Sequence, residues 1–222
     1  MAGKLVLVHT LPPLIDVFRQ LGNAMLPGVR ITHILDEPLL EQVRQRGELS
    51  AEDSERVLSH VLIAANTGAD AVMITCSTVS PCVDDVQPRV KIPVKKIDEA
   101  MIKQAVRLGM RIGVVATAES TLEPTRCLLL EEAEAQNKSI EITMVLAEGA
   151  LPALLAGQGT IHDHLVKEAT LELAESMDVI VLAQASMARV LSAISESEYQ
   201  VPVLSSPHLA LEQLRTILAV GV

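Results

Sequence analysis

Aromatic side chains are nearly absent from this sequence: its 222 residues include one Tyr, one Phe and no Trp. Aromatic cages for cationic ligands and stacking platforms for nucleic-acid bases need several such rings, so both kinds of site are excluded. The formal net charge of −10 also argues against nucleic acid and against an anionic membrane as partners. With so little aromatic surface, we expect a small polar ligand.

Other signals are missing as well. The cysteines number three, which predicts free thiols in the cytoplasm rather than a disulfide framework. No zinc-type cysteine spacing, dinucleotide or phosphate-binding loop, or serine-hydrolase elbow occurs, so we expect no metal and no cofactor. No apolar run reaches the roughly 18 residues that span a bilayer. The opening MAGKLVLVHTLPP favours a first strand over a signal peptide.

Short apolar runs alternate with amphipathic stretches, which is typical of an α/β protein with parallel sheets covered by helices. The expected strands are residues 4–10, 29–35, 70–76, 92–97, 111–117, 140–147, 178–185 and 201–206. Capping signals mark several expected helix starts. They are Ser50 with Asp53, Thr160 with Asp163, Ser80-Pro81 and Ser206-Pro207.

The eight strands form one set of four that occurs twice. KLVLVHT aligns with RIGVVAT, ADAVMITCST with MDVIVLAQAS, and IPVKKIDEAMIKQAVRLG with VPVLSSPHLALEQLRTIL. Anchored on Leu5 and Ile112, Asp70 and Asp178, and Pro93 and Pro202, the offsets are 107, 108 and 109 residues. This predicts two pseudo-symmetric, doubly wound halves, residues 1–97 and 98–202, with residues 203–222 packing back onto the first half.

Ligands of such sheets bind outside the carboxyl ends of the strands. Two related halves are expected to face these ends toward each other across one cleft. The residues at the expected strand ends are His9, Thr10, Thr75, Cys76, Ser77, Thr78, Ala116, Thr117, Gln184, Ala185, Ser186, Ser205 and Ser206.

Cys76 ends the third strand among hydroxyl side chains, which favours a reactive role over packing. A thiolate is a good base and nucleophile, but at neutral pH it needs a helix N-terminus or a cation nearby. The helix expected to begin near Ser80 would offer free N–H groups. Cys82, in its first turn, is the rival thiol, and Cys127 is interpreted as a packing residue.

ITCSTVSPCVDDV, with the segments IPVKKIDEAMIKQAVRLGMRIGVVAT and DVIVLAQASMARVL, resembles the aspartate/glutamate/hydantoin racemase superfamily over nearly the whole chain. The resemblance implies cofactor-independent isomerisation of a small carboxylate-bearing substrate by a homo-oligomer. In that superfamily two cysteines, one from each half, remove and return a proton on opposite faces of the carbon next to the carboxylate.

Cys76 matches the first of those cysteines, but the second position is Gln184, whose amide cannot serve as an acid or base. Three alternatives stay open. A single thiol could protonate a carbanion in a lyase or decarboxylase; His9 or His208 could act on the far side; or the site could only bind a carboxylate. We favour retained catalysis, with a racemase or epimerase first.

The remaining strand-end residues have two interpretations each. Thr10 and Thr117 repeat each other and could donate to a ligand or cap helices. Gln184 and Ser186 could bind the substrate or be satisfied by the backbone. Thr75, Ser77 and Thr78 add hydroxyl donors. His162-Asp163-His164 is not interpreted as a metal site, because Asp163 is expected to cap with Thr160.

Overall fold

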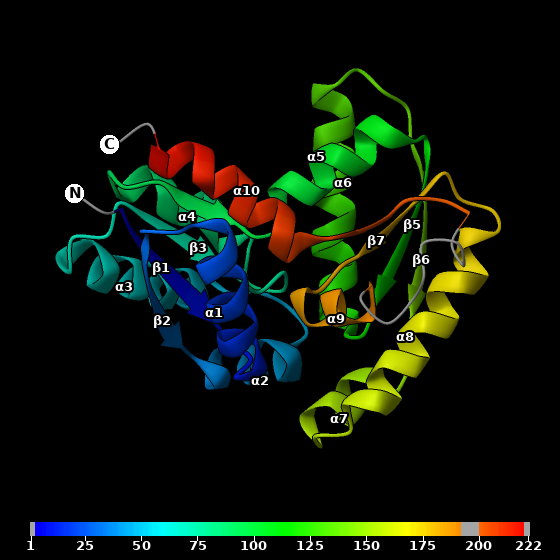
Figure 1. Ribbon diagram of the computed structural model, residues 1–222, viewed down its shortest axis with the longest axis horizontal. Coiled ribbons are helices and arrows are strands. Elements are labelled where there is room, and N and C mark those ends of the chain that lie inside the picture. Colours follow the sequence, from blue (N-terminus) through cyan, green and yellow to red (C-terminus); the bar gives the residue numbers. More distant parts are fainter. Residues whose placement is uncertain (1–2, 192–199, 220–222) are drawn as a thin grey trace. The chain divides into compact units, whose positions relative to one another are not determined.

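The computed structural model describes residues 3–191 and 200–219, and these form two compact units (Figure 1). The first unit contains the chain up to Ile97 and again from Pro207, and the second unit is Asp98–Ser206. None of the helices in the described parts of the chain is long and apolar enough to cross a membrane.

The first unit is a four-stranded parallel sheet with strand order β2-β1-β3-β4. Its strands are β1 (Lys4–His9), β2 (Arg30–Leu35), β3 (Ala71–Ile74) and β4 (Val94–Lys96). Its helices are α1 (Pro13–Met25), α2 (Glu37–Arg46), α3 (Ala51–Asn66), α4 (Cys82–Val86), the 3-10 turn η1 (Gln87–Arg89) and α10 (Ser206–Ala219). Helices α2, α3 and α4 pack on the sheet face that carries Val6 and Val8.

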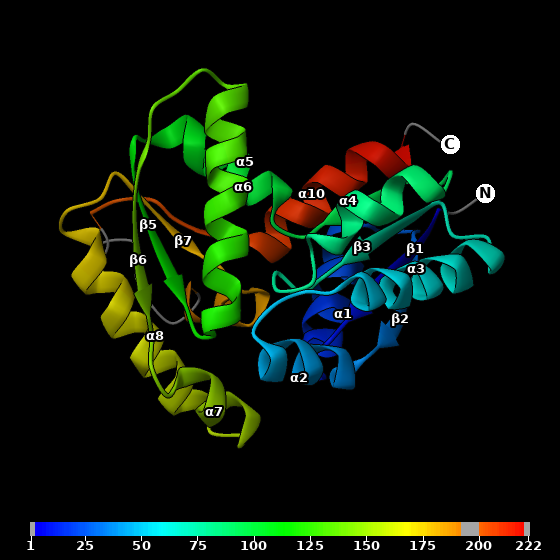
Figure 2. The same ribbon diagram turned by 180° about the vertical axis from the view of Figure 1, so that it is seen from behind.

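The second unit repeats this arrangement with strand order β6-β5-β7-β8. Its strands are β5 (Arg111–Ala116), β6 (Glu141–Leu146), β7 (Val179–Leu182) and β8 (Val203–Ser205). Its helical segments are α5 (Glu99–Leu108), η2 (Glu119–Thr121), α6 (Leu122–Ala135), α7 (Ala150–Leu155), α8 (Gly159–Ala174), η3 (Ala185–Met187) and α9 (Ala188–Leu191). Helices α5 and α6 cover one face of the sheet and α8 the other (Figures 1 and 2).

The predicted fold class is therefore confirmed: two α/β halves of the same topology follow one another along the chain. All eight strands lie within the ranges predicted from the sequence. The central strands are buried on both faces, which explains their continuous apolar runs. The chain returns to the first unit only at Pro207, because β8 pairs with β7 in the second sheet.

The duplication extends to individual hydrogen bonds. Asp70 Oδ2 accepts from Lys4 N at 2.7 Å, and Asp178 Oδ2 accepts from Arg111 N at 2.9 Å. In each half this carboxylate holds the beginning of the first strand beside the beginning of the third. The repeated aspartates are thus structural residues, which accounts for their equivalent positions in the two halves.

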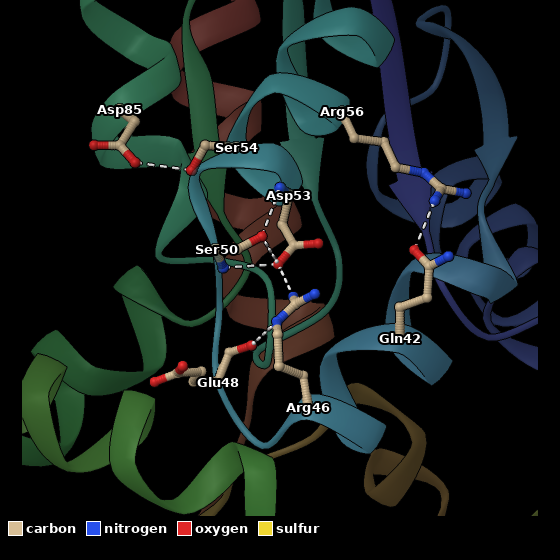
Figure 3. A network of polar contacts seen from close by, with 8 residues as sticks. All are labelled: Gln42, Arg46, Glu48, Ser50, Asp53, Ser54, Arg56 and Asp85. Carbon is tan, nitrogen blue, oxygen red and sulfur yellow. Dashed lines mark hydrogen bonds and ion pairs between the residues drawn. The ribbon is translucent and has the colours of Figure 1, made fainter.

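The capping box of Ser50 and Asp53 is confirmed at the start of α3 (Figure 3). The second predicted box is wrong. Helix α8 begins at Gly159 after Gln158, so Thr160 already lies inside its first turn. The Asp163 carboxylate instead accepts from His162 Nδ1 at 2.8 Å and from Arg189 Nε at 3.0 Å.

The two Ser-Pro signals are also wrong as caps. The residue before α4 is Pro81 and not Ser80. Ser80 belongs to the preceding turn, in which its N–H donates to the Cys76 carbonyl at 2.8 Å. Ser206 is the first residue of α10 itself. Within the described chain, the hydroxyls of Ser80 and Ser206 are buried without a hydrogen-bond partner.

Asp178 gives a test of the duplicated carboxylate. Its side chain accepts from two backbone N–H groups and from the Arg111 guanidinium, and these bonds lower its pKa from 3.8 to about 2. A carboxyl with a lowered pKa stabilises the fold above its unfolded pKa, and the effect is lost as the pH falls through the folded value. We expect Asp178→Asn to lower the thermal midpoint by a few degrees at pH 7.

The difference from the wild type should be constant above about pH 4 and narrow between about pH 4 and 2, as followed by circular dichroism. Asp16→Asn is the control, because its ion pair with Arg19 is exposed on both sides. A constant difference down to pH 2 would contradict the role given to Asp178.

Candidate functional site

The candidate site lies at the carboxyl ends of β1 and β3 in the first unit. These strands pair in parallel, with Val8 opposite Ile74, so the residues that follow both strands emerge at one edge of the sheet. We call His9, Thr10 and residues 75–80 the strand-end cluster. Its side chains are buried or nearly so, and that of Cys76 keeps 8% of its surface exposed.

A tight turn after β3 shapes this cluster. Val79 N and Ser80 N both donate to the Cys76 carbonyl, at 3.1 and 2.8 Å. Thr10 Oγ1 and Ser80 Oγ are buried, and within the described chain neither has a hydrogen-bond partner. A buried hydroxyl without a partner costs about 1–3 kcal/mol. A ligand oxygen that accepted from these hydroxyls would remove that cost, so they indicate a binding site.

The other two thiols are poor candidates for the chemistry. Burial, together with the charges of Asp53 and Asp85, raises the pKa of Cys82 to about 11, so it stays protonated at neutral pH. Cys127 is exposed on α6 and its Sγ lies 3.4 Å from Glu123 Oε1, so the expected packing role is wrong. Partial burial and the Glu123 carboxylate raise the pKa of this thiol.

His9 is completely buried, and both of its ring nitrogens already have protein partners. Nδ1 lies 2.8 Å from Thr75 Oγ1, and Nε2 lies 2.9 Å from Nδ1 of His33. Thr75 Oγ1 also donates to the Val8 carbonyl at 3.0 Å. Burial first, and then His33, lower the pKa of His9 to about 3. His9 is therefore neutral and orients Thr75, and contact with a ligand would require it to release one of these bonds.

His208 is exposed in the first turn of α10. The other end of this helix lies at the beginning of β1, where a Cβ placed on Gly3 would be 3.8 Å from Leu218 Cβ. Helix α10 thus runs opposite to β1, and its length of about 20 Å carries its first turn toward the carboxyl ends of the strands. His208 belongs to the same unit as Cys76 and lies toward the same edge.

The second sheet carries the repeat of this edge with different side chains. Gln184 Oε1 accepts from both Thr117 N, at 2.5 Å, and Thr117 Oγ1, at 2.9 Å. Its carbonyl is therefore used within the fold, whereas Thr10, the counterpart of Thr117, has a hydroxyl without a partner. Ser186 Oγ is likewise buried without a partner in the described chain. At this edge of the second sheet Gln184 and Thr117 bind each other, whereas the same edge of the first sheet carries the Cys76 thiol.

Sequence reasoning missed His33 in the second strand and Asp36 directly after it. Asp36, directly after β2, accepts from Leu39 N, Arg56 and His60, and its backbone N–H donates to the His9 carbonyl at 2.8 Å. Burial acts to raise its pKa, but the bonds from Arg56 and His60 hold the pKa below its usual value. The strand-end rule would have found Asp36, but no local signal marks His33.

In the described parts of the chain, no group of three or more His, Cys, Asp or Glu side chains is arranged to hold a metal ion. What the strand-end cluster offers is the Cys76 thiol and the hydroxyl groups of Thr10 and Ser80. Such groups can bind a carboxylate and move a proton at a neighbouring carbon.

Comparison with known proteins agrees with this description. The family model described as Asp/Glu/Hydantoin racemase matches residues 16–214. An uncharacterized protein of Schizosaccharomyces pombe is 26% identical over 152 residues, which make up 66% of this chain and 63% of that protein. The chain thus spans less than two thirds of the length of this relative.

Solved structures show the same fold. A glutamate racemase isoform from Bacillus anthracis is 17% identical with a TM-score of 0.76, over 99% of this chain and 82% of that one. An allantoin racemase from Klebsiella pneumoniae is 20% identical with a TM-score of 0.76, over 99% and 89%. An aspartate racemase from Picrophilus torridus is 12% identical with a TM-score of 0.72, over 99% and 94%.

The different environments of Cys82 and Cys127 predict different rates of alkylation. With iodoacetamide at pH 7.5, we expect native protein to be labelled at the exposed Cys127 first, and at Cys82 only after unfolding, because Cys82 is buried and protonated. Peptide mass spectrometry measures each site separately. Cys82→Ser should leave the labelling of Cys127 unchanged. Labelling of native Cys82 as fast as that of Cys127 would contradict this assignment.

Proposed function

Because the chain belongs to the Asp/Glu/hydantoin racemase family, we propose that it is a cofactor-independent racemase or epimerase of a small amino acid or related acid. It moves a proton at the carbon next to the substrate carboxylate, with Cys76 as the acid–base residue. We further propose that it works in the cytoplasm as a homo-oligomer.

The observation that carries this proposal is the placement of Cys76. It emerges from β3 beside Thr10, whose buried hydroxyl has no partner in the described chain, and its carbonyl anchors the turn that ends at the unpartnered Ser80 hydroxyl. A substrate carboxylate accepting from these hydroxyls would place its α-carbon near the thiol. Thr75, Ser77 and Thr78, which are buried beside it in the chain, are proposed as further substrate-binding residues.

The reaction balances as a proton exchange. The Cys76 thiolate takes the α-proton, and the electron pair of the broken C–H bond moves onto the substrate carboxylate. A proton returned to the opposite face gives the inverted product, whereas a proton returned by Cys76 restores the original one. We propose His208 as the acid on the opposite face, because an imidazole can both donate and accept a proton and this one is exposed toward the same edge.

Gln184 favours a second candidate function. Its side-chain carbonyl is held by Thr117, and an amide cannot supply a proton at ordinary pH. With a single thiol, a substituted malonate could lose CO₂ and leave its electron pair on carbon, where the Cys76 thiol would protonate it. This reaction needs an acid on one face only. A protein that binds carboxylates without turnover is the alternative outside enzymology.

Deuterium exchange tests the role of Cys76. Small amino and hydroxy acids incubated with the protein in D₂O should gain deuterium at the α-carbon, as followed by NMR. We expect Cys76→Ala to reduce the rate at least about 100-fold, because general acid–base residues contribute 10²–10⁴-fold. Cys127→Ala, at an exposed thiol, is the matched control and should exchange at the wild-type rate.

The products separate the alternatives. Exchange with inversion supports the racemase, and CO₂ release from a substituted malonate supports the decarboxylase. If a broad panel gives neither, and Cys76→Ala binds its ligand as well as the wild type, the protein is a binding protein. Wild-type turnover in Cys76→Ala, with the fold intact by circular dichroism, would end the thiol mechanism.

The role of His208 can be tested on the same substrates. In His208→Asn we expect α-deuteration by Cys76 to continue while inversion, measured by chiral chromatography, falls at least about tenfold. His164→Asn is the control, because His164 is an exposed histidine of the second unit. Unchanged inversion in His208→Asn would assign the opposite face to another group.

A further inference from the structure

A cavity of about 370 Å³ lies between α1 and the edge strand β2 of the first unit. It is lined by Arg19, Asn23, Val29, Ile31, Thr32 and His33. Helix α1 sits close to β2 because Gly22 has no side chain, and Ile31 occupies the space that a Cβ at this position would need. This close packing brings Arg19 and Asn23 of the helix beside His33 of the strand.

The lining combines hydrogen-bond donors with a small apolar surface. Arg19, Asn23, Thr32 and His33 supply the polar groups, Val29 and Ile31 supply the apolar part, and no carboxylate lines the cavity. The Arg19 guanidinium pairs only loosely with Asp16, at 3.2 Å with both side chains largely exposed. Such pairs contribute little, so Arg19 can turn to a ligand. This lining fits a small carboxylate with a short aliphatic part.

A second cavity of the first unit is larger but less suited to an anion. It has about 470 Å³ and lies between α2 and α3. Its two guanidinium groups are committed to the fold, since Arg46 is paired with Asp53 and Arg56 with Gln42 (Figure 3). Arg56 is also paired with Asp36. Glu52 and Asp53 also line it and would repel a carboxylate.

The first cavity connects directly to the strand-end cluster. His33 Nδ1 lies 2.9 Å from His9 Nε2 with the rings stacked, and His9 Nδ1 lies 2.8 Å from Thr75 Oγ1. Thr75 is the residue before Cys76. A protonated His33 must donate to His9 Nε2, and His9 Nδ1–H must then donate to Thr75 Oγ1. This is the direction in which the Thr75 hydroxyl donates to the Val8 carbonyl, so a charged His33 excludes the reverse direction for every hydrogen bond in this row.

A carboxylate in the cavity would change that charge. Burial lowers the pKa of His33, as does the Arg19 cation, while the Asp16 charge acts in the opposite direction. A bound carboxylate would neutralise Arg19 and favour the imidazolium form. His9 cannot take up the extra proton near neutral pH, since its own pKa is about 3.

We propose that this cavity is a regulatory site for a small aliphatic carboxylate, which binds through Arg19 and His33 and stabilises the direction of the hydrogen bonds that run from His33 through His9 to Thr75. Binding itself is independent of the proposed function, whereas its effect on turnover rests on it. The site is distinct from the strand-end cluster, because its lining residues belong to α1, to β2 and to the loop before β2, which contributes Val29.

The test is a titration of the full chain with butyrate, followed through the imidazole signals in ¹H–¹³C NMR spectra, with His33 assigned from His33→Gln. We expect a saturable shift of the His33 signal and a rise of its apparent pKa. Arg19→Gln should weaken binding at least about tenfold, the loss of roughly one charge-assisted hydrogen bond. Arg30→Gln, an exposed arginine of β2 outside the lining, is the matched control and should bind normally.

Cys76→Ala should bind butyrate at this site unchanged, which separates failure of this proposal from failure of the proposed function. Butylamine should not shift the His33 signal. Inorganic phosphate that bound as well as butyrate would overturn the preference for a carboxylate. The site itself is overturned if about 50 mM butyrate, far above a millimolar Kd, leaves His33 unshifted, or if Arg19→Gln binds as tightly as the wild type.

Discussion

The candidate site depends on one backbone hydrogen bond, from Thr75 N to the Val8 carbonyl at 2.9 Å. It extends the pairing of β1 and β3 one residue beyond the end of β3, so that Cys76 leaves the sheet at a defined point beside Thr10. The Thr75 hydroxyl strengthens the same junction by donating to the same carbonyl. Without this bond the thiol would sit on an unsupported loop, and its direction would not be determined.

The second half contains the same backbone bond, from Ala183 N to the Val115 carbonyl at 2.9 Å, yet its edge has a different role. Gln184 takes the position of the thiol and uses its carbonyl to hold Thr117. The duplicated aspartates are retained because they support the backbone of both sheets. The strand-end side chains differ between the two halves. One half therefore carries the thiol, and in the other half the side chain at the same position is bound within the fold.

The strands could be predicted because the central ones are buried apolar runs, and because three segments of one half align with three segments of the other. The start of α8 could not be predicted, because a Thr-x-x-Asp pattern does not specify where a helix begins. The Asp163 carboxylate binds Arg189, which comes from a distant segment of the chain. His9 was recognised at a strand end, but its neutral state follows from burial and from His33. That partner is placed by the pairing of β1 with β2, which no local pattern reveals.

The choice between Cys76 and Cys82 shows how neighbours override a general rule. The first turn of a helix lowers a thiol pKa, and Cys82 occupies that position in α4. Its pKa is nevertheless raised, because burial and the carboxylates of Asp53 and Asp85 outweigh the helix. Asp53 is held in place by the capping box that starts α3. The contact that begins one helix therefore adds to the effect of burial, which is the main reason that the rival thiol stays protonated, and the proposed chemistry is left to Cys76.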